Sequence, residues 1–267
     1  MTNLDKVFSI IQGYQESALL HSIVNNAPYD KRQELLKQYF PGLEKEINSL
    51  CRFISYHEFN YDLWKDIGDC LEGNNPKIHG HEDLDLSDYL FGLNQRNRLC
   101  WAGVNWEKYF DFCKDKVVLD FGCGGGFYSD LISSVAKKVF CLDKPEVINH
   151  IKDKIKLRED NCKLITDIDE IQEPLDVVWV SEVMHGKKPI DIHNILLYTS
   201  EMMPDTGLTV INELLPNTPL GKLFDVQMKI HTNGGKLYTM DEVTQFMPEI
   251  SMIKTTNYHW TIGGKVL

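Results

Sequence analysis

Three glycines stand at alternate positions, 122, 124 and 126, directly after an apolar run that ends at Phe121. The run is typical of a strand, and a helix is expected to begin near Phe127. Glycine permits backbone conformations and close approaches that a Cβ atom forbids, so a bulky ligand can rest directly on the main chain of such a turn. The pattern predicts a cofactor-binding turn, with a tight structural turn as the alternative.

The spacing of the glycines indicates the class of cofactor. A dinucleotide fingerprint, G-x-G-x-x-G, needs its third glycine at position 127, where this chain has Phe127. The G-x-G-x-G spacing, with an acidic residue two positions before the first glycine, resembles motif I of the class I S-adenosylmethionine (SAM)-dependent methyltransferases. That resemblance implies SAM as the cofactor. The residues expected beside its amino-acid and ribose portions are Asp120, Gly122, Gly124 and Gly126.

Polar residues follow three further expected strands. The strands cover residues 138–143, 162–165 and 176–180; the first ends in Asp143, and Asp167 and Ser181 follow the other two. Because parallel strands end at one edge of a sheet, we expect these side chains near the glycine turn. Asp143 can accept hydrogen bonds from ribose hydroxyls, and Asp167 is placed to meet an adenine amino group. The alternative for each carboxylate is a solvated helix cap.

The hydrophobic periodicity changes near residue 115. Upstream, apolar residues recur at helical spacing; downstream, short β-branched runs alternate with helical stretches. We therefore predict a helical N-terminal region, residues 1–112, followed by a Rossmann-like α/β domain, residues 113–267. The last two apolar runs suit an antiparallel pair that closes the sheet, which gives the seven-stranded arrangement of class I methyltransferases.

A helix expected over residues 88–111 carries many aromatic side chains, among them Trp101 and Trp106. Two interpretations remain open. These residues bury large areas where helices meet, or they form a wall of the substrate cavity. In the second case an aromatic face also stabilises a sulfonium, by cation–π attraction of about 0.5–2 kcal/mol.

Composition and charge exclude several classes of function. The 267 residues are 43% hydrophobic, enough for one sizeable α/β domain and a smaller element. A formal net charge of −11 disfavours a nucleic-acid partner, because phosphate binding needs clustered Lys and Arg. We find no apolar run of membrane-spanning length and no signal peptide, so we expect a cytoplasmic protein without a membrane partner. The 7 cysteines form no C-x-x-C pair, which favours reduced thiols.

One cluster of residues hints at a metal. His79 and His81 stand beside Glu82 and Asp83. A second ligand pair with suitable spacing is missing from the sequence, so we predict no metal site.

A second resemblance begins at residue 173. Residues 173–185 are similar to the segment of small-molecule O-methyltransferases, the caffeate, hydroxyindole and polyketide group, that ends in their catalytic histidine. Residues 210–216, 223–228 and 233–239 resemble the substrate-side region of the same group. The resemblance implies that His185 takes a proton from an acceptor hydroxyl, a role that imidazole can fill near neutral pH. The substrate contacts expected are Trp101, Trp106, Met184, Phe224 and Met228. The resemblance also implies a homodimer.

Two departures from that group concern the histidine. The group continues after it with an acidic or amide residue and a tryptophan, where this chain has Gly186-Lys187-Lys188. Leu237 stands where the group commonly has a charged residue. The carboxylate that orients His185 is therefore unassigned. Glu213 is the remaining candidate, and we expect it one residue off the required strand face.

The leading interpretation is a SAM-dependent methyltransferase that acts on a hydroxyl, or less favourably an amine, of a small molecule in specialised metabolism. One alternative is a related scaffold that uses SAM for cyclisation, cleavage or rearrangement, since such enzymes need no base beside a methyl acceptor. Another is a catalytically silent binding protein. The intact glycine turn and Asp143 argue against this last alternative.

Overall fold

The structure, a computed structural model, describes residues 3–46, 48, 85–100, 104–152, 161–232, 235–246, 252–255 and 259–262. The chain forms two compact units, Met1–Tyr61 and Asp62–Leu267. The predicted boundary lies later in the chain, between residues 112 and 113. The difference has a physical cause: Leu90 and Phe110, which precede the sheet, lie in one buried cluster with Val118 and Trp179 of the sheet.

The first unit is helical in its described part. It consists of α1 (Asn3–Asn26), α2 (Tyr29–Tyr39) and a short 3₁₀ helix, η1 (Leu43–Glu46). Pro28 separates α1 from α2, with an extended backbone at φ −53° and ψ 140°. A proline cannot continue the hydrogen-bond ladder of one helix but is well suited to precede the next. Ile23, Val24 and Leu36 are buried where α1 and α2 meet.

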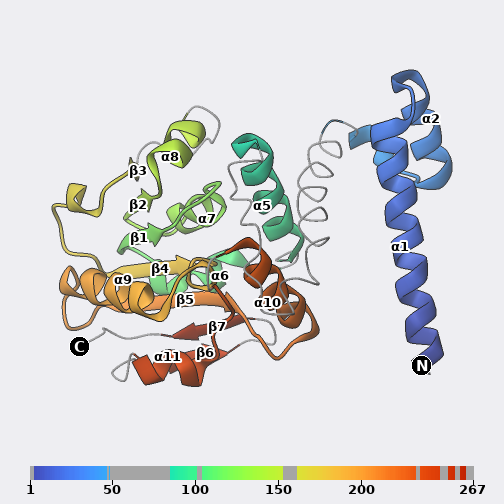
Figure 1. The fold of residues 1–267 in the computed structure, drawn as a ribbon. Helices are drawn as coiled ribbons and strands as arrows, with labels where there is room; N and C mark the ends of the chain where they lie inside the picture. The colour runs from blue at the N-terminus through green and yellow to red at the C-terminus, as the bar shows by residue number, and fades with distance from the viewer. Residues whose placement is uncertain are drawn as a thin grey trace. The chain divides into compact units, whose positions relative to one another are not determined.

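The second unit is built on a sheet whose centre is five parallel strands in the order β3-β2-β1-β4-β5 (Figure 1). Their bounds are β1 Val117–Phe121, β2 Lys138–Leu142, β3 Cys162–Ile165, β4 Val177–Ser181 and β5 Leu208–Leu214. β7 (His259–Ile262) pairs antiparallel with β5, and β6 (Met252–Thr255) pairs antiparallel with β7. The predicted α/β fold with a parallel sheet is therefore present. The strand order reverses between β1 and β4, and α/β sheets bind ligands beside the carboxyl ends of strands at such a reversal.

Helices connect the strands. Before the sheet lie α5 (Leu86–Cys100), α6 (Trp106–Tyr109) and η3 (Asp111–Cys113); after β1 and β2 come α7 (Phe127–Ser133) and α8 (Pro145–Ile151). The remaining helices are η4 (Ile168–Glu170), η5 (Met184–Gly186), α9 (Pro189–Glu201), α10 (Pro219–His231) and α11 (Met240–Phe246). The single helix expected over 88–111 is thus interrupted, because Asn105 has an extended backbone and caps α6 by accepting a hydrogen bond from the N–H of Lys108.

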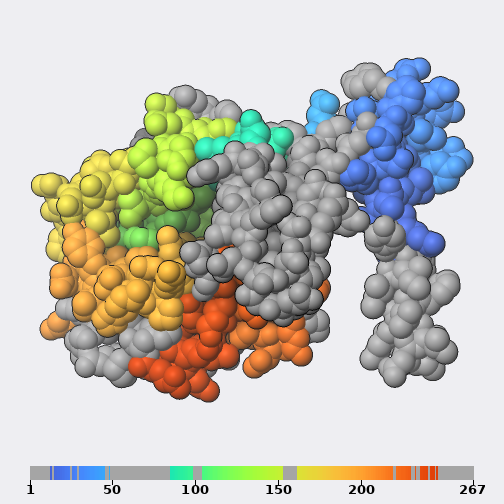
Figure 2. All heavy atoms as spheres, viewed as in Figure 1, coloured from blue at the N-terminus to red at the C-terminus, as the bar shows by residue number. Residues whose placement is uncertain are grey.

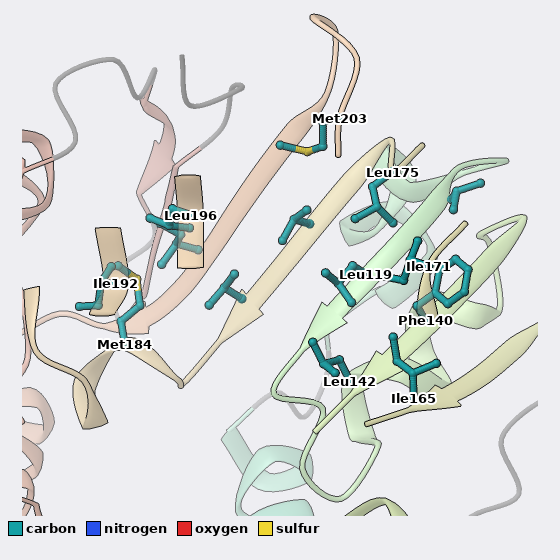
Figure 3. Packing of buried hydrophobic residues seen from close by; sticks show 14 of the residues in the cluster. Leu119, Phe140, Leu142, Ile165, Ile171, Leu175, Met184, Ile192, Leu196 and Met203 are labelled. Atoms are coloured by element: carbon teal, nitrogen blue, oxygen red, sulfur yellow. The ribbon is translucent and has the colours of Figure 1, made fainter. Parts of the chain in front are cut away.

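Alternation along the strands divides the core into two layers. Val117 and Leu119 of β1 face a cluster that includes Ile192 and Leu196 of α9, whereas Val118 faces a cluster with α5, α7 and α8. Figure 3 shows the first cluster, with Leu119 and Phe140 on the sheet and Ile192 and Leu196 close to Met184. Successive residues of a strand point to opposite faces, so helices on both faces are needed to bury this apolar sequence.

The outer side of α9 is at the molecular surface. Ile190 and Tyr198 are exposed to 60% and 44% on this helix. In Figure 2 the helix lies among the yellow and orange spheres of the second unit. Of the helices in the described residues, none is long and apolar enough to cross a membrane.

Candidate cofactor and active site

The glycine turn after β1 has the backbone conformation that its sequence predicts. Gly122, Gly124 and Gly126 have φ values of 77°, 51° and 75°, all in the left-handed region. A Cβ atom on Gly122 would lie 2.5 Å from Cγ2 of Val183, so that position also lacks space for a side chain. Residues with a Cβ atom adopt this region only at a cost. The three glycines are therefore required by the path of the chain.

Backbone hydrogen bonds hold the turn against β2. The N–H groups of Gly122 and Cys123 both donate to the carbonyl oxygen of Leu142, at 2.9 and 3.0 Å. Gly126 donates to the carbonyl of Cys123 at 2.9 Å and then forms the N-cap of α7. The turn thus passes directly from the end of a buried strand to the start of a helix, where main-chain N–H groups are available to a ligand.

Asp143 is in contact with this turn, as expected from the strand-end argument. Its Oδ2 accepts a hydrogen bond from the N–H of Gly124 at 2.7 Å, and its Oδ1 accepts one from the N–H of Lys144 at 2.7 Å. The side chain is half-buried. The carboxylate therefore links the end of β2 to the middle of the glycine turn.

Asp120 lies beneath the turn and does not line an open surface. Its carboxyl is 1% exposed and accepts a hydrogen bond from Oγ of Ser129 on α7 at 2.5 Å. Burial raises the pKa of Asp120 to about 7; the hydrogen bond from Ser129 opposes that rise, and the charge of Asp143 adds to it. The side chain of Asp120 supports the turn from below, and the contact with cofactor that the resemblance implies stays a prediction.

Asp167 follows β3 and forms a cap. Its side chain accepts a hydrogen bond from the N–H of Asp169 at 3.0 Å, and Glu170 completes a capping box at η4. The same residue borders a pocket of about 470 Å³ at the carboxyl ends of β1 and β2. Residues around this pocket include Phe121, Leu142, Thr166, Ile195 and Tyr198. Both interpretations of Asp167, helix cap and pocket residue, are thus compatible with its position.

Ser181 ends β4 inside a buried polar group. Asn212 of β5 donates from Nδ2 to Oγ of Ser181 at 2.8 Å, and the same nitrogen lies 3.4 Å from the hydroxyl of Tyr128. The three side chains are at most 6% exposed. They connect β4, β5 and the first turn of α7 at the carboxyl edge of the sheet.

His185 is oriented by a buried carboxylate. Its Nδ1 lies 2.9 Å from Oε2 of Glu213, which is 3% exposed, and Oε1 of Glu213 accepts the N–H of Met184 at 2.7 Å. The expectation that Glu213 lies off the required face is wrong. Glu213 shares a face of β5 with Ile211, the face toward η5, and its side chain is long enough to meet the η5 backbone and His185 together.

Phe224 and Met228 of α10 lie close to the histidine or to its neighbours. The Phe224 ring contacts the His185 ring edge-to-face, with centroids 4.9 Å apart and an interplanar angle of 82°. Phe224 and Met228 form one buried cluster with Leu214 and Leu237. Leu237 therefore fills an apolar position here, which accounts for the missing charge at this point of the sequence.

Two of the other expected substrate contacts lie elsewhere. Met184 is 2% exposed and packs in the core between the sheet and α9 (Figure 3). Trp106 stacks on Phe110, with centroids 6.0 Å apart, and meets Phe127 edge-to-face, so it joins the aromatic core. Trp101 lies outside the described residues.

Helix α5 contributes two side chains that the sequence did not indicate. Nδ2 of Asn94 donates to the carbonyl of Gly125 at 2.9 Å, and Arg96 forms an ion pair with Glu182, three residues before His185. Neither belongs to a local motif. Asn94 is 31 residues from its partner in the sequence and Arg96 is 86 residues from its partner, so only the tertiary fold brings each pair together.

The described residues contain no group of three or more His, Cys, Asp or Glu side chains that is arranged to hold a metal ion. The cluster at 79–83 lies outside them. Among the described residues, Cys113, Cys123, Cys141 and Cys162 are not joined in disulfides.

Comparison with known proteins places this fold. No protein-family model matches the sequence. The chain is similar to human N-acetylserotonin methyltransferase in complex with SAM, with a TM-score of 0.72, 14% identity and 99% of this chain and 98% of that chain covered. It is similar to an O-methyltransferase family protein from Burkholderia thailandensis, with a TM-score of 0.69, 14% identity and coverage of 99% and 98%. The structure of PigF with S-adenosylhomocysteine (SAH) gives a TM-score of 0.75, 16% identity and 99% coverage of both chains. At such identities the likeness shows the fold alone, and the fold is that of these methyltransferases.

Proposed function

We propose that the chain is a SAM-dependent O-methyltransferase that acts on a small molecule. The glycine turn, the carboxylate of Asp143 and the shared fold support the choice of cofactor. The observation that carries the proposed chemistry is the buried pairing of Glu213 with Nδ1 of His185, at 2.9 Å. A histidine held by a carboxylate at the carboxyl edge of such a sheet has the arrangement of a general base.

The residues at the turn fit the cofactor. Positive φ values at Gly122, Gly124 and Gly126 leave the main chain open to close approach, and Asp143 stands beside Gly124 to accept ribose hydroxyls. Asp167, which borders the pocket after β3, is assigned to the adenine edge of the cofactor. Ser181, at the carboxyl end of β4, is assigned to the cofactor site as well. When bound, SAM supplies an electrophilic methyl group on a positively charged sulfur.

The base works through one ring nitrogen. A carboxylate only accepts hydrogen bonds, so the Nδ1–H group of His185 donates a hydrogen bond to Glu213 and the ring's lone pair is on Nε2. Nε2 would then take the proton of an acceptor hydroxyl as the oxygen–methyl bond forms and the sulfur–methyl bond breaks, with SAH as the leaving group. The resulting imidazolium is stabilised by Glu213, which is already paired with it. General base catalysis of this kind contributes about 10²–10⁴-fold.

The acceptor is assigned to an aromatic or mixed apolar class. Phe224 lies against the base and Met228 belongs to the same apolar cluster, which supports a cavity for a flat hydroxylated molecule. Trp101 remains a predicted wall of that cavity. The resemblance of the sequence to small-molecule O-methyltransferases further supports the seven-stranded form of the sheet and a cytoplasmic location. It also supports a helical N-terminal region that covers the substrate and forms a homodimer.

The test separates cofactor binding from chemistry. Calorimetry with SAH measures the cofactor site, and methyl-labelled SAM with a panel of catechol, 5-hydroxyindole and caffeate measures transfer. His185→Asn is expected to keep SAH binding and to lose about 100-fold or more of the transfer rate. The control is His193→Asn on α9. Retained transfer in His185→Asn removes the base assignment, and consumption of SAM without a methylated product supports the alternative chemistry of cyclisation, cleavage or rearrangement.

A further inference from the structure

We propose that Arg96 and Glu182 form a positioning pair that sets the place of His185 relative to the glycine turn. The inference rests on the proposed function, since it concerns how the base and the cofactor turn are held together. Glu182 lies between the end of β4 and the turn that carries His185. Its ion-pair partner Arg96 comes from α5, a helix that precedes the sheet.

The backbone at Glu182 is the first reason. Glu182 has φ 56°, and among the described residues only one other non-glycine residue, Asp115, has a positive φ. A residue other than glycine adopts a positive φ at a cost in energy, so the surrounding structure must hold it in that conformation. Glu182 is held at two points. Its N–H donates to the carbonyl of Asn212 at 3.0 Å, and its carboxylate is paired with Arg96.

The burial of the pair is the second reason. The side chains of Arg96 and Glu182 are 25% and 15% exposed, so neither charge is fully solvated. Removing one charge leaves the other without compensation in a poorly solvated place. The pair therefore fixes the carboxylate of Glu182, and with it the peptide from which the η5 turn starts.

A chain of contacts continues from Arg96 to the base. The guanidinium carbon of Arg96 lies 5.9 Å from the centroid of the Phe224 ring, within the range of a cation–π contact. Phe224 in turn contacts His185 edge-to-face. Arg96 thus reaches His185 by two routes, through the backbone at Glu182 and through the ring of Phe224.

The same helix touches the cofactor turn. Asn94, two positions before Arg96, donates to the carbonyl of Gly125 at 2.9 Å, and its Oδ1 lies 2.4 Å from the place where a Cβ of Gly125 would be. A single helix therefore contacts both the glycine turn and the residue that leads to the base. Methyl transfer is an in-line displacement, and an error of 1 Å in the placement of the base can cost about 100-fold in rate.

The experiment uses the full chain saturated with SAH. The His185 Cε1–H resonance, identified by its loss in His185→Asn, carries a ring-current shift from Phe224 and so reports the placement of the imidazole. Arg96→Met/Glu182→Gln removes both charges at nearly constant volume and leaves no lone buried charge. Glu182→Gly keeps the left-handed backbone without the carboxylate. The matched control, Lys138→Met/Glu173→Gln, removes an ion pair between β2 and the segment before β4.

We expect the double variant and Glu182→Gly to move the His185 resonance and to lower the turnover of the methylated panel compound by about 100-fold, with SAH affinity nearly unchanged. Arg96→Lys is expected to restore part of the turnover, and the control variant to match the wild type. An unmoved resonance and full turnover in the double variant would overturn the positioning role. So would equal losses of SAH affinity and turnover, which indicate a general structural role for α5.

The proposed function fails in a different way. Absence of SAH binding by the wild-type chain removes the cofactor assignment, whatever the variants do. If SAH binds but no panel compound is methylated, the His185 resonance still tests the positioning pair.

Discussion

Glu213 contacts His185 and Met184 with its two oxygens, at 2.9 Å to the imidazole Nδ1 and 2.7 Å to the backbone N–H. One buried carboxylate therefore fixes both the ring and the main chain that carries it. The η5 turn places Met184 in the core and His185 at the carboxyl edge of the sheet, so this anchoring couples the orientation of the base to the packing of the fold.

Replacing Glu213 by Gln is expected to lower the turnover of methyl transfer by about 100-fold or more and to leave SAH affinity unchanged. The Gln oxygen can still accept the N–H of Met184. Its NH₂ group then donates to Nδ1, so the imidazole proton moves to Nε2 and blocks the base. Methylation kinetics and SAH calorimetry measure the two effects, with Glu173→Gln as the control. Wild-type turnover in Glu213→Gln would show that the carboxylate does not set the tautomer.

The glycine turn offers a matched pair of substitutions. Gly122→Ala is expected to lower the free energy of unfolding by about 3 kcal/mol, because it adds a clash with Val183 to the cost of the positive φ. Gly124→Ala also has an unfavourable positive φ, but no atom lies within 4 Å of its Cβ. Its loss in the free energy of unfolding is therefore expected to be only about 1 kcal/mol. Urea unfolding measures both.

Val183→Ala provides the control for that pair. Combined with Gly122→Ala it removes the clashing Cγ2 atom, so the double variant is expected to recover the steric part of the loss and to keep the part due to φ. Equal losses in the two glycine variants would contradict the steric argument.

Sequence patterns predicted those parts of the site that depend on neighbouring residues. The glycine turn and the strand ends at Asp143 and Asp167 each rest on a local rule, and the structure has both features. The α/β fold follows from the same alternation of short strands and helices. The family resemblance added the position of His185.

What the sequence could not supply depends on contacts between distant segments. Arg96 and Glu182 are 86 residues apart, and no local sequence pattern marks them as partners. Glu213 was the remaining candidate to orient His185, but its strand face was misjudged because the position of the η5 turn is not readable from the sequence. Met184 and Trp106 were assigned to the substrate on residue type, which cannot distinguish a cavity wall from an aromatic or apolar core.

Asp143→Asn is expected to reduce SAH affinity by about 10-fold to 100-fold. The carboxylate accepts the N–H groups of Gly124 and Lys144 with separate oxygens, and an amide has only one oxygen to offer them. The turn is then held less firmly, and an acceptor for the ribose hydroxyls is lost. Calorimetry measures the change. Asp115→Asn, at an exposed position before β1, is the comparison and is expected to leave SAH affinity unchanged; equal losses in both variants would contradict a special role for Asp143.

Asp120 makes the stability of the fold depend on pH. Burial raises its pKa to about 7 in the folded chain, against an ordinary value of 3.8. The folded state therefore binds more protons than the unfolded state between these values, and stability falls as pH rises. The contribution is fully present below about 3.8 and is lost as pH rises through about 7. Asp120→Asn stays neutral at every pH and removes this dependence.

Relative to Asp120→Asn, the wild type is expected to lose free energy of unfolding steadily between about pH 4 and pH 7, as measured by urea unfolding in the absence of cofactor. Ser129→Ala sharpens the test. The hydrogen bond from Ser129 lowers the pKa of Asp120, so its removal raises that pKa further and moves the loss of stability to higher pH. Parallel stability curves for the wild type and Asp120→Asn would mean that Asp120 does not titrate in this range. Its carboxyl would then be ionised beneath the turn, with Ser129 and the surrounding dipoles sufficient to stabilise the charge.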